Sequence, residues 1–227
     1  MKKGLTEIVF ILDRSGSMSG LEKDTIGGFN SMLKKQQKEN GEALVSTILF
    51  DDSCDVIHDR VPIGDVKPLT EDDYFVCGST ALLDAIGGAV HHISNVHKYA
   101  RDEDRPEKTL FIITTDGMEN SSRIYSYPKV KKMIERQKKK YGWEFLFLGA
   151  NMDAIKTAGS IGIDADRAAT YLCDEAGTAL NYEVLNEAVK QIRCFDAPLD
   201  AKWKEAIEKD TKKRKKKKST KKCCGKN

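Results

Sequence analysis

An unbroken apolar run that ends in an acid and two hydroxyls constrains the fold of this chain more than any other feature. Residues 8–12 read IVFIL, with no alternation of polar side chains, which is typical of a strand buried on both faces of a parallel sheet. Asp13, Ser15 and Ser17 follow directly. Because α/β proteins place their sites in loops at the carboxyl ends of parallel strands, this loop is the first candidate site.

Helical and extended patterns alternate along the rest of the chain. Helical spacing of apolar side chains predicts helices over residues 21–38, 81–99, 128–140, 151–160 and 178–193, and apolar runs predict strands over 43–50, 54–61, 110–114, 143–148 and 168–172. A three-residue link between the first two of these strands favours an antiparallel hairpin at an edge. We therefore expect an α/β fold: a doubly wound, mostly parallel sheet with one antiparallel edge strand and helices on both faces.

Charge divides the chain into two parts. Residues 209–227 carry eleven Lys and Arg against one Asp, a charge of +10, which leaves −7 for the remainder of a 227-residue chain whose net charge is +3. A dense block of like charges predicts disorder. We expect one domain over residues 1–208, large enough to bury about 70% of its unfolded surface, and a basic, disordered tail over residues 209–227.

Cysteine usage and hydropathy predict a cytoplasmic protein. The six cysteines are widely spread and form no CxxC pair, so neither a zinc site nor a disulfide framework is indicated. The apolar stretch before Asp13 is shorter than the roughly 7–15 residues of a signal peptide. No segment reaches the ~18 apolar residues of a membrane span.

Two further loops carry oxygen ligands that suit a hard cation. Thr80 precedes the helix expected over residues 81–99, and Asp116 follows the strand expected over 110–114. Taken alone, Ser79 and Thr80 fit a helix cap and Asp116 fits a tight turn. Taken with the first loop, they offer the hydroxyl and carboxylate oxygens that Mg²⁺ binds. The sequence thus predicts a magnesium site at the point where the three loops meet.

This constellation closely resembles the von Willebrand factor type A (vWA) domain, a Rossmann-like fold, and its metal-ion-dependent adhesion site. That family's signature is Asp-x-Ser-x-Ser after the first strand, a Thr in the next loop and an Asp after the fourth strand. Asp13, Ser15 and Ser17, then Thr80, then Asp116 match it in order, within a resemblance that covers roughly residues 4–193. The resemblance implies direct coordination by the three hydroxyls, aspartates that act mostly through water, and a partner's Glu or Asp completing the octahedron.

The leading hypothesis is therefore a non-catalytic, Mg²⁺-dependent protein-binding module, with Mn²⁺ or Ca²⁺ as alternative ions. A second hypothesis is a nucleic-acid-associated protein that binds nucleic acid or an anionic surface unspecifically through its tail. A third is a magnesium-dependent phosphohydrolase with Asp13 as nucleophile. Dehalogenase-like phosphatases carry Asp-x-Asp after their first strand, whereas this chain has Ser15 at the second acidic position.

The remaining acidic and basic clusters indicate solvated surface. This applies to the aspartates at positions 51, 52, 55, 72 and 73 and to the lysines of the helix expected over residues 128–140. The sequence leaves open the partner, the biological process, the oligomeric state, any movement of the last helix, and the role of Cys223 and Cys224.

Overall fold

The structure, a computed structural model, describes residues 1–150, 152–195 and 198–223. Six strands form one sheet in the order β3-β2-β1-β4-β5-β6. Their bounds are β1 (Lys2–Asp13), β2 (Glu42–Phe50), β3 (Cys54–Pro62), β4 (Pro106–Thr115), β5 (Glu144–Ala150) and β6 (Ala168–Tyr171). The β2–β3 pair is antiparallel and every other neighbouring pair is parallel. The predicted α/β fold is therefore confirmed.

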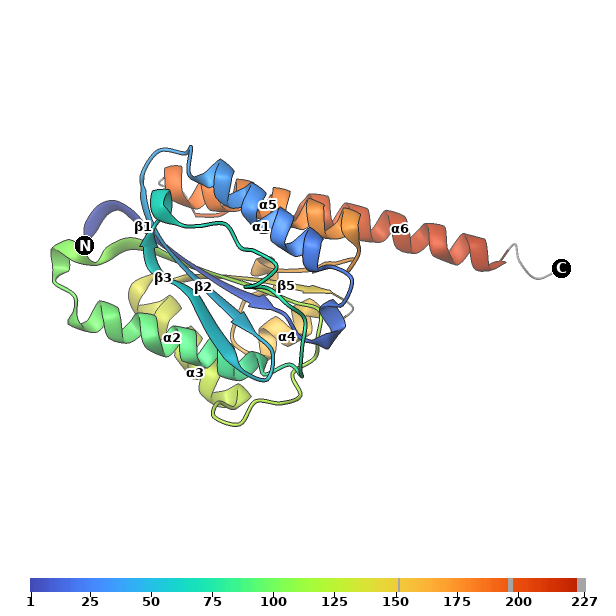
Figure 1. Cartoon of the computed structure of the whole chain (residues 1–227), viewed down its shortest axis with the longest axis horizontal. Coiled ribbons are helices and arrows are strands. Elements are labelled where there is room, and N and C mark those ends of the chain that lie inside the picture. Colours follow the sequence, from blue (N-terminus) through green and yellow to red (C-terminus); the bar gives the residue numbers. More distant parts are fainter. Residues whose placement is uncertain (151, 196–197, 224–227) are drawn as a thin grey trace.

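Six helices of the described chain cover the two faces of this sheet (Figure 1). They are α1 (Glu22–Gln36), α2 (Leu82–Tyr99), α3 (Tyr127–Tyr141), α4 (Ala154–Ser160), α5 (Glu175–Cys194) and α6 (Glu205–Cys223). One core lies beneath α1 and α5, and the other beneath α2, α3 and α4. Among the described helices, none combines the length and apolar character needed to cross a bilayer.

Strand β1 supplies both cores because its side chains alternate between the two faces. Ile8, Phe10 and Leu12 belong to the core beneath α1 and α5, while Val9 and Ile11 belong to the other. The Phe10 ring meets the Phe29 ring of α1 edge-on, with centroids 5.2 Å apart. An uninterrupted apolar run is what a strand covered on both faces requires.

Local capping sets several helix ends close to where the sequence predicts them. Pro128 lies in the first turn of α3, and Gly142 ends that helix in a left-handed conformation. The helix expected over residues 151–160 begins only at Ala154, because the Asp153 carboxylate caps it by accepting from the Lys156 amide. Residue 151 lies outside the described residues.

The structure describes residues 205–223 of the basic end as a helix, which crosses the boundary expected after residue 208. Helix α6 spans Glu205–Cys223 and extends beyond the body of the molecule (Figure 1). Ile207 is buried, Thr211 donates to the Thr170 carbonyl of β6 at 3.1 Å, and Arg214 pairs with Asp174. These contacts, with ion pairs one turn apart such as Glu205–Lys209, hold the first half of the helix. Residues 224–227, including Cys224, lie outside the described residues.

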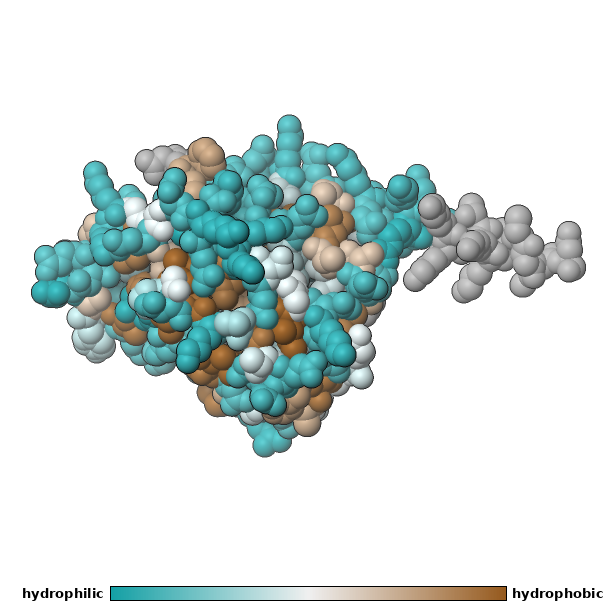
Figure 2. Space-filling model, turned by 45° about the horizontal axis from the view of Figure 1, so that its top comes forward, coloured by the Kyte–Doolittle hydropathy of each residue, from teal (hydrophilic) through white to brown (hydrophobic). Residues whose placement is uncertain are grey.

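A close helix crossing depends on Gly28. A Cβ at this position of α1 would lie 2.2 Å from Cδ2 of the buried Tyr182 in α5. The neighbouring Gly27 has no atom within 4 Å of the corresponding point. Figure 2 shows a surface that is hydrophilic over most of its visible area.

We predict opposite effects of Ala at these adjacent glycines. Gly28→Ala should destabilise the fold by about 1–3 kcal/mol, because the new methyl overlaps the Tyr182 ring. Gly27→Ala should stabilise it by about 0.5–1 kcal/mol, because Ala reduces the entropy lost on helix formation. Urea unfolding of both variants measures this difference, and equal shifts of their midpoints would contradict the packing described.

Candidate metal centre

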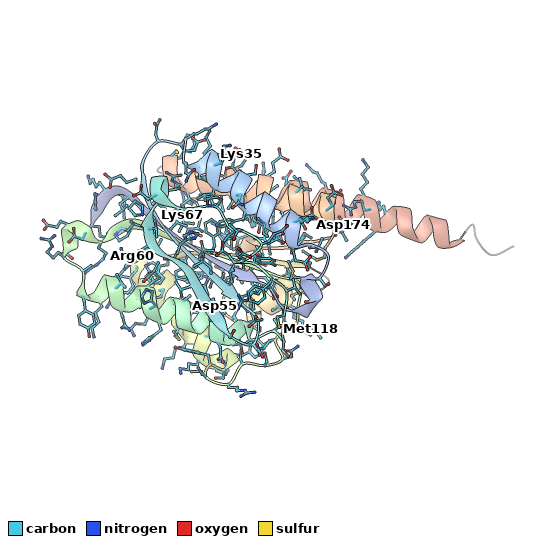
Figure 3. All side chains as sticks on the ribbon, in the orientation of Figure 1. Lys35, Asp55, Arg60, Lys67, Met118 and Asp174 are labelled. Atoms are coloured by element: carbon cyan, nitrogen blue, oxygen red, sulfur yellow. The ribbon has the colours of Figure 1, made fainter. Side chains whose placement is uncertain are left out.

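The three predicted loops converge at one edge of the sheet. Strands β1 and β4 are parallel neighbours with Leu12 beside Thr114, so the residues that follow them emerge together. Asp13 ends β1, Asp116 follows β4, and Thr80 stands two residues before α2. Figure 3 shows Met118 and Asp174, from loops after β4 and β6, at this same end of the molecule.

Three hydroxyls meet here and form what we call the hydroxyl cradle: the side chains of Ser15, Ser17 and Thr80. The Oγ atoms of Ser15 and Ser17 are 3.2 Å apart, and Thr80 Oγ1 donates to Ser15 Oγ at 3.1 Å. Ser17 Oγ also donates to Asp116 Oδ1. Ser15 and Thr80 are buried, whereas Ser17 is exposed, so the cradle is accessible from one side.

Asp13 lies behind the cradle and is fixed by two donors. Its Oδ1 accepts from the Ser15 amide at 2.7 Å, and its Oδ2 accepts from the Thr115 hydroxyl. Burial raises the pKa of the Asp13 carboxyl above its usual value; hydrogen bonds from Ser15 and Thr115 act in the opposite direction, and the charge of Asp116 adds to the rise. A cation at the cradle would favour the ionised carboxylate. The sequence analysis did not identify Thr115.

Gly117 leaves the space in front of the cradle open. A Cβ on this residue would lie 2.4 Å from Thr80 Oγ1 and 3.3 Å from Ser15 Oγ. No cluster of three or more His, Cys, Asp or Glu side chains occurs in the described part of the chain, so the candidate centre relies on hydroxyls together with two carboxylates. This donor set fits a hard, oxygen-preferring cation.

Thr80 is not the helix cap that its sequence context allows. Ala81 occupies the N-cap position of α2. The first free amides of α2 donate instead to the loop after β4: Leu83 N to Glu119 Oε2 at 2.8 Å and Asp84 N to Ser122 Oγ at 3.0 Å. The Thr80 hydroxyl is thereby left for the cradle. Sequence reasoning missed these partners because they lie more than 35 positions away, with no fixed spacing to reveal them.

The interpretation of Asp51 as solvated surface is wrong. Asp51 is buried and accepts from the Nε atom of buried Arg14 at 3.0 Å. Burial acts to raise the pKa of Asp51, but hydrogen bonds from Ser53 and the charge of Arg14 outweigh it, so the pKa lies below its usual value. Arg14 also stacks over the Phe75 ring, 4.8 Å from its centroid. Because Arg14 is paired with Asp51, its positive charge repels a cation at the neighbouring cradle less strongly.

A cysteine also contacts this centre, which the sequence analysis did not anticipate. Cys173, just after β6, donates its thiol to Asp116 Oδ2 at 3.4 Å. Burial, followed by the charge of Asp116, raises the pKa of the Cys173 thiol to about 12. The sulfur is therefore protonated at neutral pH and orients the Asp116 carboxylate as a weak donor.

No protein-family model and no curated protein matches the sequence. Solved structures do match the fold. Proximal thread matrix protein 1 from the mussel byssus aligns at 15% identity and a TM-score of 0.54, over 84% of this chain and 46% of that one. A von Willebrand factor type A protein from Catenulispora acidiphila aligns at 14% identity and a TM-score of 0.51, over 82% and 42%.

Two other structures extend the comparison. The ArnB paralog VWA2 from Sulfolobus acidocaldarius aligns at 16% identity and a TM-score of 0.51, over 83% of this chain and 45% of that one. The mussel protein with a zinc-occupied MIDAS motif aligns at 12% identity and a TM-score of 0.54, over 82% and 46%. The chain spans less than half the length of these proteins. The sheet order and these likenesses together establish that this chain has the fold of a von Willebrand factor type A domain.

Proposed function

We propose that this chain is a cytoplasmic, non-catalytic protein-binding module that holds Mg²⁺ in the hydroxyl cradle and docks an acidic residue of a partner protein. Ser15, Ser17 and Thr80 would coordinate the ion directly, and Asp13 and Asp116 would act mainly through water. The single observation that carries this proposal is the convergence of three hydroxyls beside a glycine whose Cβ would fill the space.

The chemistry of the cradle explains the preference for an acidic partner. Neutral hydroxyl ligands leave most of the positive charge on a bound ion, and Mg²⁺ completes its octahedron with further oxygens. The exposed Ser17 side gives a partner's Glu or Asp access to that position. Mn²⁺ or Ca²⁺ are alternatives, and the zinc in the MIDAS motif of the mussel protein is a further ion to compare.

Two observations support the non-catalytic and cytoplasmic parts of the proposal. Both Asp13 oxygens accept hydrogen bonds within the fold, which disfavours Asp13 as the nucleophile of a phosphohydrolase. Cys54, Cys77, Cys173 and Cys194 are free thiols, consistent with a reducing compartment.

We predict that Thr80→Val weakens Mg²⁺ binding at least about tenfold, because it removes one coordinating oxygen and keeps the side-chain shape. Gly117→Ala should weaken it similarly by filling the space. Calorimetric titration of the full chain measures both effects, with Ser19→Ala as a control that alters an exposed hydroxyl of the same loop.

Acetate, present in parallel titrations as a stand-in for the partner's carboxylate, tests the last coordination position. The parent should bind Mg²⁺ more tightly with acetate, and the Thr80 and Gly117 variants should not. Unchanged Mg²⁺ affinity in both variants, with and without acetate, would refute the proposed centre.

Helix α6 favours nucleic-acid binding as a second candidate function. Lys212, Lys213, Lys215 and Lys216 are exposed on a helix that extends beyond the body of the molecule (Figure 1). Like charges one turn apart repel each other, and a polyanion would relieve that repulsion. Binding of this kind is unspecific and depends strongly on salt.

We predict that replacing four lysines of α6 with Gln reduces the slope of log affinity for duplex DNA against log salt concentration by about 3–4, because each lost phosphate contact contributes about 0.9. The substituted residues are Lys212, Lys213, Lys215 and Lys216. Fluorescence anisotropy with labelled duplex DNA at several salt concentrations gives the slope.

The matched control makes the same change of charge on helix α3, at Lys131, Lys132, Lys139 and Lys140. It should leave the slope within about 1 of the parent value. Equal losses in the two variants would mean that net charge alone is responsible, and that α6 is not the contact surface.

A further inference from the structure

A short series of contacts joins helix α6 to the candidate metal centre. Cys173 donates its thiol to Asp116 Oδ2 at 3.4 Å. The next residue in the chain, Asp174, pairs with Arg214 in the middle of α6. Asp174 is itself held by the start of α5, because its Oδ1 accepts from the Gly177 amide at 2.9 Å. The loop that contacts the centre therefore also positions α6.

Beyond Arg214, α6 leaves the body of the molecule at the end that carries the metal centre. Figure 1 shows α6 projecting past the sheet, and Figure 3 shows Met118 and Asp174 at this same end. Residues 215–223 of the helix extend about 13 Å further, at 1.5 Å per residue. A partner that docks on the centre thus has the second half of α6 beside it.

The charges of α6 are segregated along its length. Its three acidic residues, Glu205, Glu208 and Asp210, lie in the first two turns, where Glu205 pairs with Lys209. Residues 211–223 contain nine Lys and Arg and no Asp or Glu. The half of α6 that projects at the metal end is therefore the half without acidic residues of its own, and its potential favours an anion.

We propose that the partner presents an acidic segment, of which one Glu or Asp binds the metal ion while further acidic side chains pair with the lysines of α6. This inference rests on the proposed function, because the first contact is the carboxylate at the metal. An extended segment covers about 3.3 Å per residue. Acidic residues about three or more positions from the metal-binding one would therefore reach α6.

The two contacts select the same charge and reinforce each other. An ion held by neutral hydroxyls keeps most of its positive charge, and the projecting half of α6 extends the positive field along one side. Exposed ion pairs are individually weak, but pairs on a segment already held at the metal form at a high effective concentration. A nucleic acid on α6 needs the helix alone, so dependence on Mg²⁺ separates the two kinds of ligand.

Fluorescence anisotropy of the full chain with two labelled peptides tests this inference. Both peptides consist of Gly and Ser around one central Glu, and the acidic peptide carries further Glu residues three to six positions away on each side. In Mg²⁺ the acidic peptide should bind at least about tenfold more tightly than the single-Glu peptide. Replacing Mg²⁺ with EDTA at matched ionic strength should weaken the acidic peptide at least about tenfold.

Variants locate the second contact. Changing four lysines of α6 to Gln should reduce the advantage of the acidic peptide to about twofold or less, and it should leave the single-Glu peptide and Mg²⁺ itself within about twofold of the parent. The substituted residues are Lys212, Lys213, Lys215 and Lys216, which are exposed. The matched control, with Gln at Lys131, Lys132, Lys139 and Lys140 of α3, should keep the advantage. Equal losses in the two variants would show that net charge alone is responsible and would overturn the inference.

The outcomes distinguish this inference from the function on which it rests. If calorimetry shows no Mg²⁺ binding by the full chain, both fail. If Mg²⁺ and the single-Glu peptide bind but the acidic peptide has no advantage, only the acidic segment is refuted. Equal binding of the acidic peptide in Mg²⁺ and in EDTA would also refute it, and would leave α6 as an unspecific surface for polyanions.

Discussion

Burial of β1 on both faces is the constraint on which the rest of the structure depends. Residues 8–12 are at most 3% exposed, and each such side chain contributes about 1.5–3 kcal/mol when it is fully buried. Parallel pairing with β2 and β4 satisfies the strand's backbone on both edges. The strand therefore fixes the sheet, both helical layers, and the position at which Asp13 and Arg14 emerge.

The polar groups at the end of β1 organise the loops around them. Asp13 and Arg14 are buried, and a buried charge without partners is costly. Thr115, Asp51 and the Ser15 amide supply those partners from three different segments. The loop after β4 in turn caps α2, which leaves the Thr80 hydroxyl directed at Ser15. The same hydrogen bonds and ion pairs therefore stabilise these loops and preorganise the candidate centre.

The two ends of the sheet have different chemistry. At the carboxyl ends of the parallel strands, hydroxyls and carboxylates converge and the neighbouring Arg14 is paired with Asp51, which suits a metal ion. At the amino ends of β4 and β5, basic side chains line a cavity beside buried aromatic rings, and one of them, Arg105, pairs with Asp102. Helix α6, which extends beyond the body of the molecule, adds a third charged surface.

The sequence by itself determined the α/β class and the antiparallel edge strand, and it predicted the five residues of the candidate centre, because apolar periodicity and strand-end chemistry are local patterns. Only the tertiary structure brought Thr115 to Asp13, Asp51 to Arg14 and Glu119 to the start of α2. The contacts of α6 with Asp174 and Thr170 are also long-range, so a count of charges along the sequence does not reveal them. These contacts join segments far apart in the chain, and their energies come from burial, which no sequence spacing encodes.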